Sequence, residues 1–178
     1  MIRYSTYEIF EISRLEFDTM TTAVDVMTDL LDAQVRSIHG DLEDATEEMI
    51  HWHAHENANT IAVTIWHFSR IADMVANVIL SDKEPSQQFW FTDGYAEKYD
   101  YNPLGKGIRE WGILTGFTPE EMHEIPEISK EDTLAYFDKA FESVKTHIEG
   151  MNDEAFDAPI SGAGGDRSAY YWTRLIVV

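Results

Sequence analysis

The chain has 178 residues, of which 44% are hydrophobic, and it carries a formal net charge of -20 at pH 7. This length and composition fit one globular domain, residues 1–178, with a sizeable core. The negative charge repels phosphate backbones and anionic membranes, so we expect neither nucleic acid nor a membrane as a partner.

Two further absences narrow the class of protein. No apolar run approaches the roughly 20 residues of a membrane helix, and the N-terminus lacks the pattern of a signal peptide, so we expect a cytoplasmic protein. The chain contains no cysteine. Any bound metal must therefore be held by histidine, by carboxylates or by backbone oxygen atoms.

Two long helices are predicted in the first half of the chain. The first begins near Ser5, where Ser5 and Glu8 fit a capping box, and ends near Gly40. Its apolar face is spaced by threes and fours: Met20, Val24, Met27, Leu31, Val35 and Ile38. After a short helical turn within 41–50, the second helix starts near Asn57 or Asn59 and runs to about Leu80. Its polar side is expected to be Arg70, Asp73 and Asn77, with Arg70 and Asp73 as a surface ion pair.

Residues 81–129 break the helical pattern with many glycines, prolines and aromatic residues. So many large rings predict an ordered segment packed over the helices, not a disordered linker. Thr118, Pro119 and Glu121 predict one short helix in it, through a capping box with proline at the first helical position.

A third helix is predicted from Ser129 or Lys130. Its apolar seam has the spacing of a helical bundle: Leu134, Phe137, Phe141, Val144, Ile148 and Met151. After a loop at 157–166, a fourth element follows. It is either a helix capped by Ser168, with Tyr171, Leu175 and Val178 on one face, or a strand over its last three residues. The apolar pattern stops at Val178 without a helix-ending signal, so we expect the fourth helix to be truncated there.

Four histidines gather at residues 51–67. His51, His53 and His55 would share one side of an extended segment, which suits a surface metal patch, but such a run before a helix is more often a solvated loop, the interpretation we favour. His67 falls on the apolar side of the second helix. It is either a metal ligand or a core histidine bonded to a carbonyl or carboxylate, and residue chemistry favours the core histidine. A zinc site needs three or four protein ligands, and this helix supplies one.

Three stretches together resemble the DinB-like superfamily, which contains bacillithiol- and mycothiol-dependent S-transferase-like enzymes. The stretch HWHAHENANTIAVTIWHFSRIAD (51–73) is similar to that family's loop and second helix. GILTGFTPEEM (112–122) resembles a recurring G-x-G-F-T-x-E-E pattern, and LAYFDKAFESVKTHIEGMNDEAFDAP (134–159) resembles the third helix and its exit. The likeness covers nearly the whole chain.

The resemblance implies an all-α, up-down-down-up four-helix bundle, often dimeric, with a long aromatic-rich excursion between the second and third helices. It also implies a divalent metal, nickel or zinc, held by three histidines. His67 matches the ligand on the second helix. The other two would form an HxxxH pair on the fourth helix, which would begin about where this chain stops, so the ligand set is incomplete in this chain.

Two functions from different classes follow from these observations. The first is a metal-dependent, thiol S-transferase-like enzyme with His67 as a metal ligand, in which the metal lowers the pKa of a small-molecule thiol. The second is a non-catalytic homodimeric bundle, stress-related or small-molecule-binding and without a bound metal, in which His67 belongs to the core.

Overall fold

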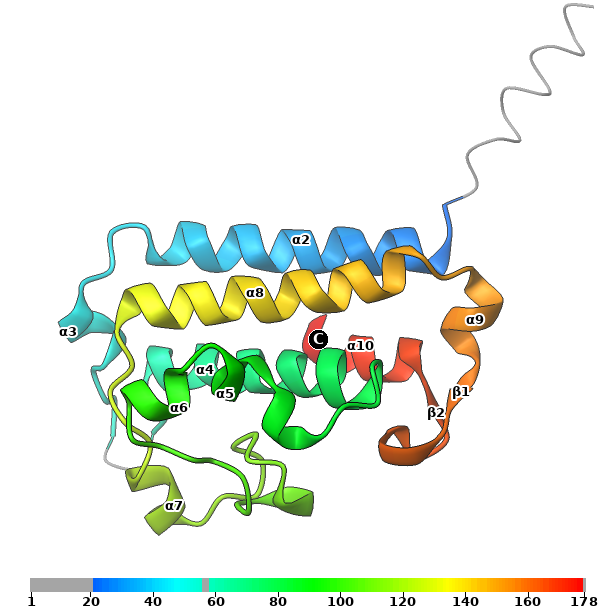
Figure 1. The fold of residues 1–178 in the computed structure, drawn as a ribbon. Coiled ribbons are helices and arrows are strands. Elements are labelled where there is room, and N and C mark those ends of the chain that lie inside the picture. Colours follow the sequence, from blue (N-terminus) through cyan, green and yellow to red (C-terminus); the bar gives the residue numbers. More distant parts are fainter. Residues whose placement is uncertain (1–20, 56–57, 178) are drawn as a thin grey trace, which may run out of the picture.

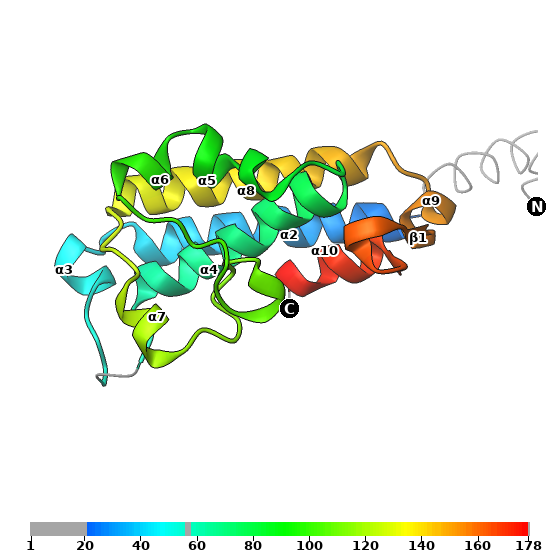
Figure 2. The same cartoon turned by 60° about the horizontal axis from the view of Figure 1, so that its bottom comes forward.

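The computed structural model describes residues 21–55 and 58–177. Most of this part of the chain is helical, and its one sheet is an antiparallel pair of two-residue strands, β1 (Pro159–Ile160) and β2 (Arg167–Ser168). The predicted all-α class is therefore confirmed. Four helices lie side by side (Figures 1 and 2): α2 (Ala23–Leu42), α4 (Ile61–Asp73), α8 (Lys130–Glu149) and α10 (Ala169–Val177). No helix among the described residues is long and apolar enough to cross a membrane.

Helix α2 begins at a capping box. The Thr22 hydroxyl accepts a hydrogen bond from the Asp25 amide at 3.0 Å, and the Asp25 carboxylate accepts one from the Thr22 amide at 2.9 Å. The predicted end at Gly40 was wrong by two residues, because Gly40 keeps a negative φ and the helix continues to Leu42. The predicted start at Ser5 and the face residue Met20 lie outside the described residues.

Helix α4 begins one residue after Thr60, whose hydroxyl accepts a hydrogen bond from the Val63 amide at 3.1 Å. Thr60 is the cap in place of the predicted Asn57 or Asn59, of which Asn57 is outside the described residues. The helix passes without interruption into a π-helical segment, η1 (Met74–Ile79), and ends at Leu80 as predicted.

Helix α8 forms the centre of the core. It begins at Lys130, one of the two predicted starts, with Ser129 as its cap, and packs against both α4 and α2. Phe137, Phe141, Val144 and Ile148 of the predicted seam are each 0–1% exposed. Burying a side chain of this size contributes about 1.5–3 kcal/mol, so the seam is a principal source of stability.

Helix α10 settles the alternatives left open for the end of the chain. The Ser168 hydroxyl caps it by accepting from the Tyr171 amide at 3.3 Å, and the strand alternative was wrong. Of the three residues predicted to share one face, Tyr171 packs partly buried against the core and Leu175 is 40% exposed, while Val178 lies outside the described residues. The Trp172 indole N–H donates to the Gly164 carbonyl at 3.0 Å and turns the other side inward. The buried residues are Ala169, Trp172, Thr173 and Ile176.

Residues 81–129 form the ordered excursion that the aromatic content predicted. Most of its short helices lie along α4 and α8, while α7 (Pro119–His123) lies near the start of α4 (Figures 1 and 2). The predicted Thr118–Glu121 capping box begins α7. The remaining short elements of the described chain are α3 (Glu47–Ile50), η2 (Pro85–Gln87), α5 (Phe89–Thr92), α6 (Tyr95–Lys98), η3 (Ile108–Glu110), α9 (Asp153–Asp157) and η4 (Gly162–Gly164).

Candidate functional site

His67 lies half-buried in the middle of α4. Its Nδ1 atom is in hydrogen-bond contact with the carbonyl oxygen of Ile113, which belongs to the excursion. A carbonyl only accepts, so Nδ1 carries the proton, and in the neutral ring Nε2 keeps its lone pair. Burial lowers the pKa of His67, while the hydrogen bond to Ile113 partly opposes this effect. This neutral ring, oriented by a backbone carbonyl, is the form in which histidine usually binds metals, and it also matches a core histidine with one satisfied nitrogen.

The surroundings of His67 do not complete a metal site. Within residues 21–55 and 58–177, no three histidine, aspartate or glutamate side chains gather as a ligand group. His67 therefore supplies a single donor where zinc or nickel chemistry requires about three. The described residues by themselves do not fit the metal that the sequence resemblance implies.

The histidine run before α4 does not gather around His67 as one ligand group. His51 ends α3, with its Nε2 atom 3.5 Å from the Glu47 carboxylate. The Nδ1 atom of His53 is 3.0 Å from the carbonyl oxygen of Ala58, and His55 is exposed. The loop interpretation fits these positions, and His53 has a further role as a pocket residue.

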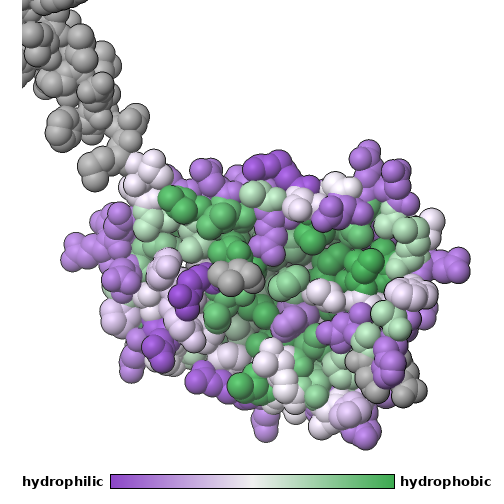
Figure 3. Space-filling view, turned by 180° about the vertical axis from the view of Figure 1, so that it is seen from behind, coloured by the Kyte–Doolittle hydropathy of each residue, from purple (hydrophilic) through white to green (hydrophobic). Residues whose placement is uncertain are grey.

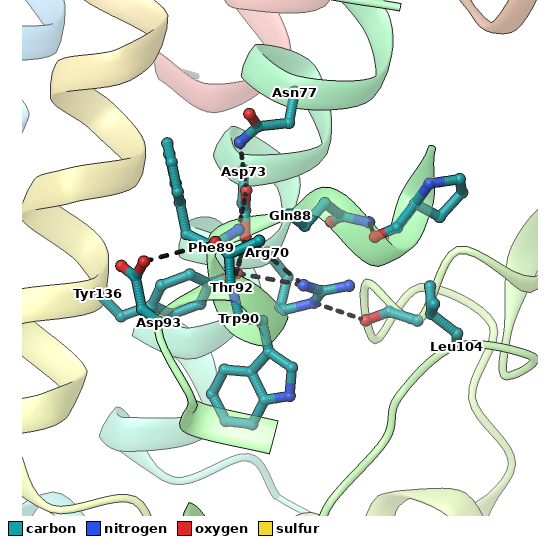
Figure 4. Close-up of polar contacts among 12 residues, drawn as sticks. Arg70, Asp73, Asn77, Gln88, Phe89, Trp90, Thr92, Asp93, Leu104 and Tyr136 are labelled. Carbon is teal, nitrogen blue, oxygen red and sulfur yellow. Dashed lines mark hydrogen bonds and ion pairs between the residues drawn. The ribbon is translucent and has the colours of Figure 1, made fainter. Parts of the chain in front are cut away.

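The expected surface ion pair is wrong, because Arg70 and Asp73 are both 0% exposed. The Arg70 guanidinium donates to the Gly112 carbonyl at 3.1 Å and to the Tyr136 hydroxyl at 3.2 Å, and lies 3.7 Å from the Asp73 carboxylate. The excursion covers this side of α4, so the polar stripe that looked solvent-facing is enclosed (Figure 4). Asn77 is buried with it.

The Asp73 carboxylate is the centre of this buried network. It accepts four hydrogen bonds: from the Tyr136 hydroxyl at 2.7 Å, the Asn77 amide at 2.8 Å, and the backbone amides of Phe89 and Trp90 at 3.0 and 3.1 Å. Burial, reinforced by the negative charge of Asp73, raises the pKa of Tyr136. The network joins α4, α5 and α8, so we assign it to holding the excursion in place.

A Ser–His pair lies on another part of the molecule. The Ser81 hydroxyl is 2.7 Å from His147 Nε2, and His147 Nδ1 is 2.6 Å from the Ser143 carbonyl oxygen. The same hydroxyl donates to the Ala76 carbonyl at 2.6 Å. The single hydroxyl proton is therefore shared between two acceptors, the Ala76 carbonyl and the imidazole. The pair ties the end of η1 to α8.

A cavity of about 330 Å³ opens between the start of α4 and α7. Two of its residues, His53 and His123, come from distant parts of the sequence and are brought to one pocket by the fold. His123 was missed in the sequence, where a single histidine in an acidic helix gives no signal. The lining residues are His53, Ala58, Asn59, Thr60, Val63, Phe117, Pro119, Met122 and His123.

The sequence matches the family described as the DinB superfamily over residues 30–178, and the chain belongs to that superfamily. The resemblance found in the sequence is thus confirmed. The fold is similar to the crystal structure of a conserved protein from Enterococcus faecalis, with a TM-score of 0.69, 14% sequence identity, and coverage of 89% of this chain and 88% of that one. At this identity the likeness concerns the fold alone. None of the curated proteins matches the sequence.

Proposed function

We propose that this DinB-superfamily protein binds a small organic molecule in the pocket between α4 and α7. The observation that carries the proposal is the cavity of about 330 Å³ lined by residues from three separate segments. Ligand sites are typically concave, largely apolar and furnished with a few polar groups, with volumes of about 300–1,000 Å³. Val63, Phe117 and Met122 supply the apolar walls here, and His53 and His123 supply polar groups.

The walls of the pocket rest on a rigid support. Val63, Phe117 and Met122 pack against a buried aromatic cluster in which the Trp66 and Trp90 rings meet edge to face at 5.8 Å. The Arg70–Asp73 network fixes the same excursion to α4. A pocket supported in this way is formed before a ligand arrives, which lowers the ordering cost of binding.

A fragment screen tests this proposal. Ligand-observed NMR with a set of small aromatic and aliphatic fragments should detect binders to the wild-type protein. Val63→Trp fills the pocket and should abolish their binding. The matched control is Thr146→Trp, which adds the same ring at an exposed site on α8 and should leave binding unchanged. A fragment set that binds neither the wild type nor the control, or that binds all three proteins alike, contradicts the proposal.

We also propose that the main helices form an up-down-down-up bundle and that the protein is a homodimer. The colours of Figure 1 support the bundle: α4 and α8 run in one direction, and α2 and α10 in the other.

The dimer is supported by apolar side chains that gather on the face of the molecule turned away from the viewer in Figure 1 (Figure 3). Large apolar residues that are 40% exposed or more include Val26, Leu30, Ile61 and Leu175. Sedimentation of Leu30→Glu should give a monomer if this surface is the interface.

A second candidate function is a metal-dependent, thiol S-transferase-like enzyme in which His67 is one ligand. The contact of His67 Nδ1 with the Ile113 carbonyl is compatible with this role, because it orients a neutral ring whose Nε2 lone pair can bind a metal. A bound nickel or zinc would lower the pKa of a thiol supplied by the cosubstrate. The remaining ligands would have to come from outside the described residues of this chain.

Elemental analysis of the purified protein tests this second candidate. Stoichiometric nickel or zinc that is lost in His67→Ala and kept in His39→Ala would support it. His39 is a suitable control, since it is exposed on α2 and paired with Asp138. Metal-free wild-type protein, or metal retained by His67→Ala, would overturn the assignment of His67.

A further inference from the structure

The residues that line the pocket between α4 and α7 indicate which class of small molecule it binds. This inference rests on the proposed function, that the pocket binds a small molecule. The apolar part of the lining combines the Phe117 ring with the Met122 thioether and Val63. Aromatic rings pack favourably against other rings, and a methionine side chain adapts to flat surfaces and makes favourable contacts with ring edges. A volume near the lower limit for ligand sites suits one ring or two fused rings.

His53 offers a hydrogen-bond acceptor to a ligand in the pocket. Its Nδ1 atom is 3.0 Å from the Ala58 carbonyl oxygen, which accepts only, so Nδ1 carries the proton. In the neutral ring the other nitrogen, Nε2, is an acceptor. The Thr60 hydroxyl accepts from the Val63 amide as the cap of α4 and keeps its own O–H, and Asn59 adds a side-chain amide to the lining, so the pocket also holds groups that can bind the oxygen of a ligand hydroxyl. The ligand is therefore expected to donate a hydrogen bond to His53.

The charges around the pocket disfavour an anion. Among the described residues that line it, none is a lysine or an arginine. Glu120 and Glu121 occupy the first turn of α7, next to the lining residues Pro119 and Met122, and the whole chain carries a net charge of -20. A carboxylate or phosphate would therefore enter a negative potential without a cationic partner.

We propose that this pocket binds a neutral aromatic molecule bearing a hydroxyl group, with its ring against Phe117 and Met122 and its hydroxyl donating to Nε2 of His53. Two other classes of ligand, an aromatic acid and an aromatic molecule without a hydrogen-bond donor, each differ from the proposed class in a single group. They are therefore suitable comparison ligands.

Calorimetric titration at pH 7 with three naphthalene probes tests the inference. 2-Naphthol is neutral and has a donor, 2-methoxynaphthalene lacks the donor, and 2-naphthoate is an anion. We expect 2-naphthol to bind roughly two- to tenfold more tightly than 2-methoxynaphthalene, the range of one hydrogen bond, and 2-naphthoate to bind more weakly than both.

Variants of the two pocket histidines identify the acceptor. His53→Phe should abolish the preference for 2-naphthol while it keeps the affinity for 2-methoxynaphthalene, which also shows that the pocket is intact. His39→Phe, at an exposed site on α2 outside the pocket, is the control and should keep the preference, and His123→Phe tests whether the second pocket histidine is the acceptor instead. Equal binding of the two neutral probes, tighter binding of the anion, or loss of the preference only in His123→Phe overturns the inference. So does a failure of all three probes to bind, and the fragment screen decides separately whether the pocket binds other molecules.

Discussion

Removal of the Asp73 carboxylate is the most informative test of how the excursion is held on the bundle. In Asp73→Ala, the four donors from Tyr136, Asn77, Phe89 and Trp90 lose their common acceptor. The Arg70 guanidinium, which is 0% exposed, also loses its carboxylate neighbour. Breaking a buried charge pair by removing one partner typically costs about 3–5 kcal/mol, because the remaining charge stays buried.

We therefore expect the free energy of unfolding of Asp73→Ala to fall by about 3–5 kcal/mol, which corresponds to a decrease in Tm of roughly 6–20 °C in a domain of this size. Chemical denaturation followed by circular dichroism measures the loss. Asp138→Ala is the control, since Asp138 pairs with His39 at the surface and its side chain is 45% exposed. It should cost about 1 kcal/mol or less.

A double-mutant cycle then separates the charge from the loss of packing. Arg70→Met combined with Asp73→Ala removes both charges, so the double variant should lose less stability than the sum of the two single variants. A loss below about 1.5 kcal/mol in Asp73→Ala, or strict additivity in the cycle, would show that the network does not carry a buried charge pair.

Four further variants test single residues of the core and the site. Tyr101→Phe should leave stability unchanged or raise it by about 1 kcal/mol, because the buried hydroxyl has no hydrogen-bond partner among the described residues; denaturation measures this, and a loss would indicate a bound water or ligand. His67→Gln should flatten the pH dependence of stability below pH 6.5. There the unfolded chain binds a proton that folded His67, with its lowered pKa, does not, so wild-type stability falls as the pH falls; an unchanged slope refutes the assignment. Gly112→Ala should cost more than Gly165→Ala, although both glycines have a positive φ. A Cβ at Gly112 would lie 2.4 Å from the Pro103 carbonyl oxygen, whereas at Gly165 it meets nothing within 4 Å; equal thermal shifts would contradict this. Thr60→Ala should cost about 0.5–2 kcal/mol as a lost helix cap, measured by denaturation, and no loss would place the cap elsewhere.

Local signals in the sequence predicted much of the fold. Thr118 and Ser168 were identified as caps because a cap depends on residues within one helical turn, and the start of α8 was predicted at Ser129 or Lys130. The seam of α8 was predicted because its period of three and four leaves one face to bury. The cap of α4 was predicted at Asn57 or Asn59 but is Thr60. Several adjacent residues can serve as caps, and the packing of the helix selects among them.

The site depended on contacts that a local pattern does not contain. Arg70 and Asp73 look like a surface pair on the helix, and their burial follows only from the excursion that lies over them. The partner of His67 is the Ile113 carbonyl, 46 residues further along the chain. The pocket combines His53 with His123, and nothing in the spacing of these two residues indicates that they meet.

The NMR signal of the Met122 methyl group reports whether a ligand enters the pocket between α4 and α7. The protein has seven methionines, of which Met122 lines the pocket and Met27 is buried in the main core. With 13C-methyl-labelled methionine, titration with 2-naphthol should shift the Met122 signal in a saturable way and leave the Met27 signal in place. The shift should disappear in Val63→Trp. A Met122 signal that does not move, while another methionine responds, would contradict the account, because it would place the ligand site elsewhere.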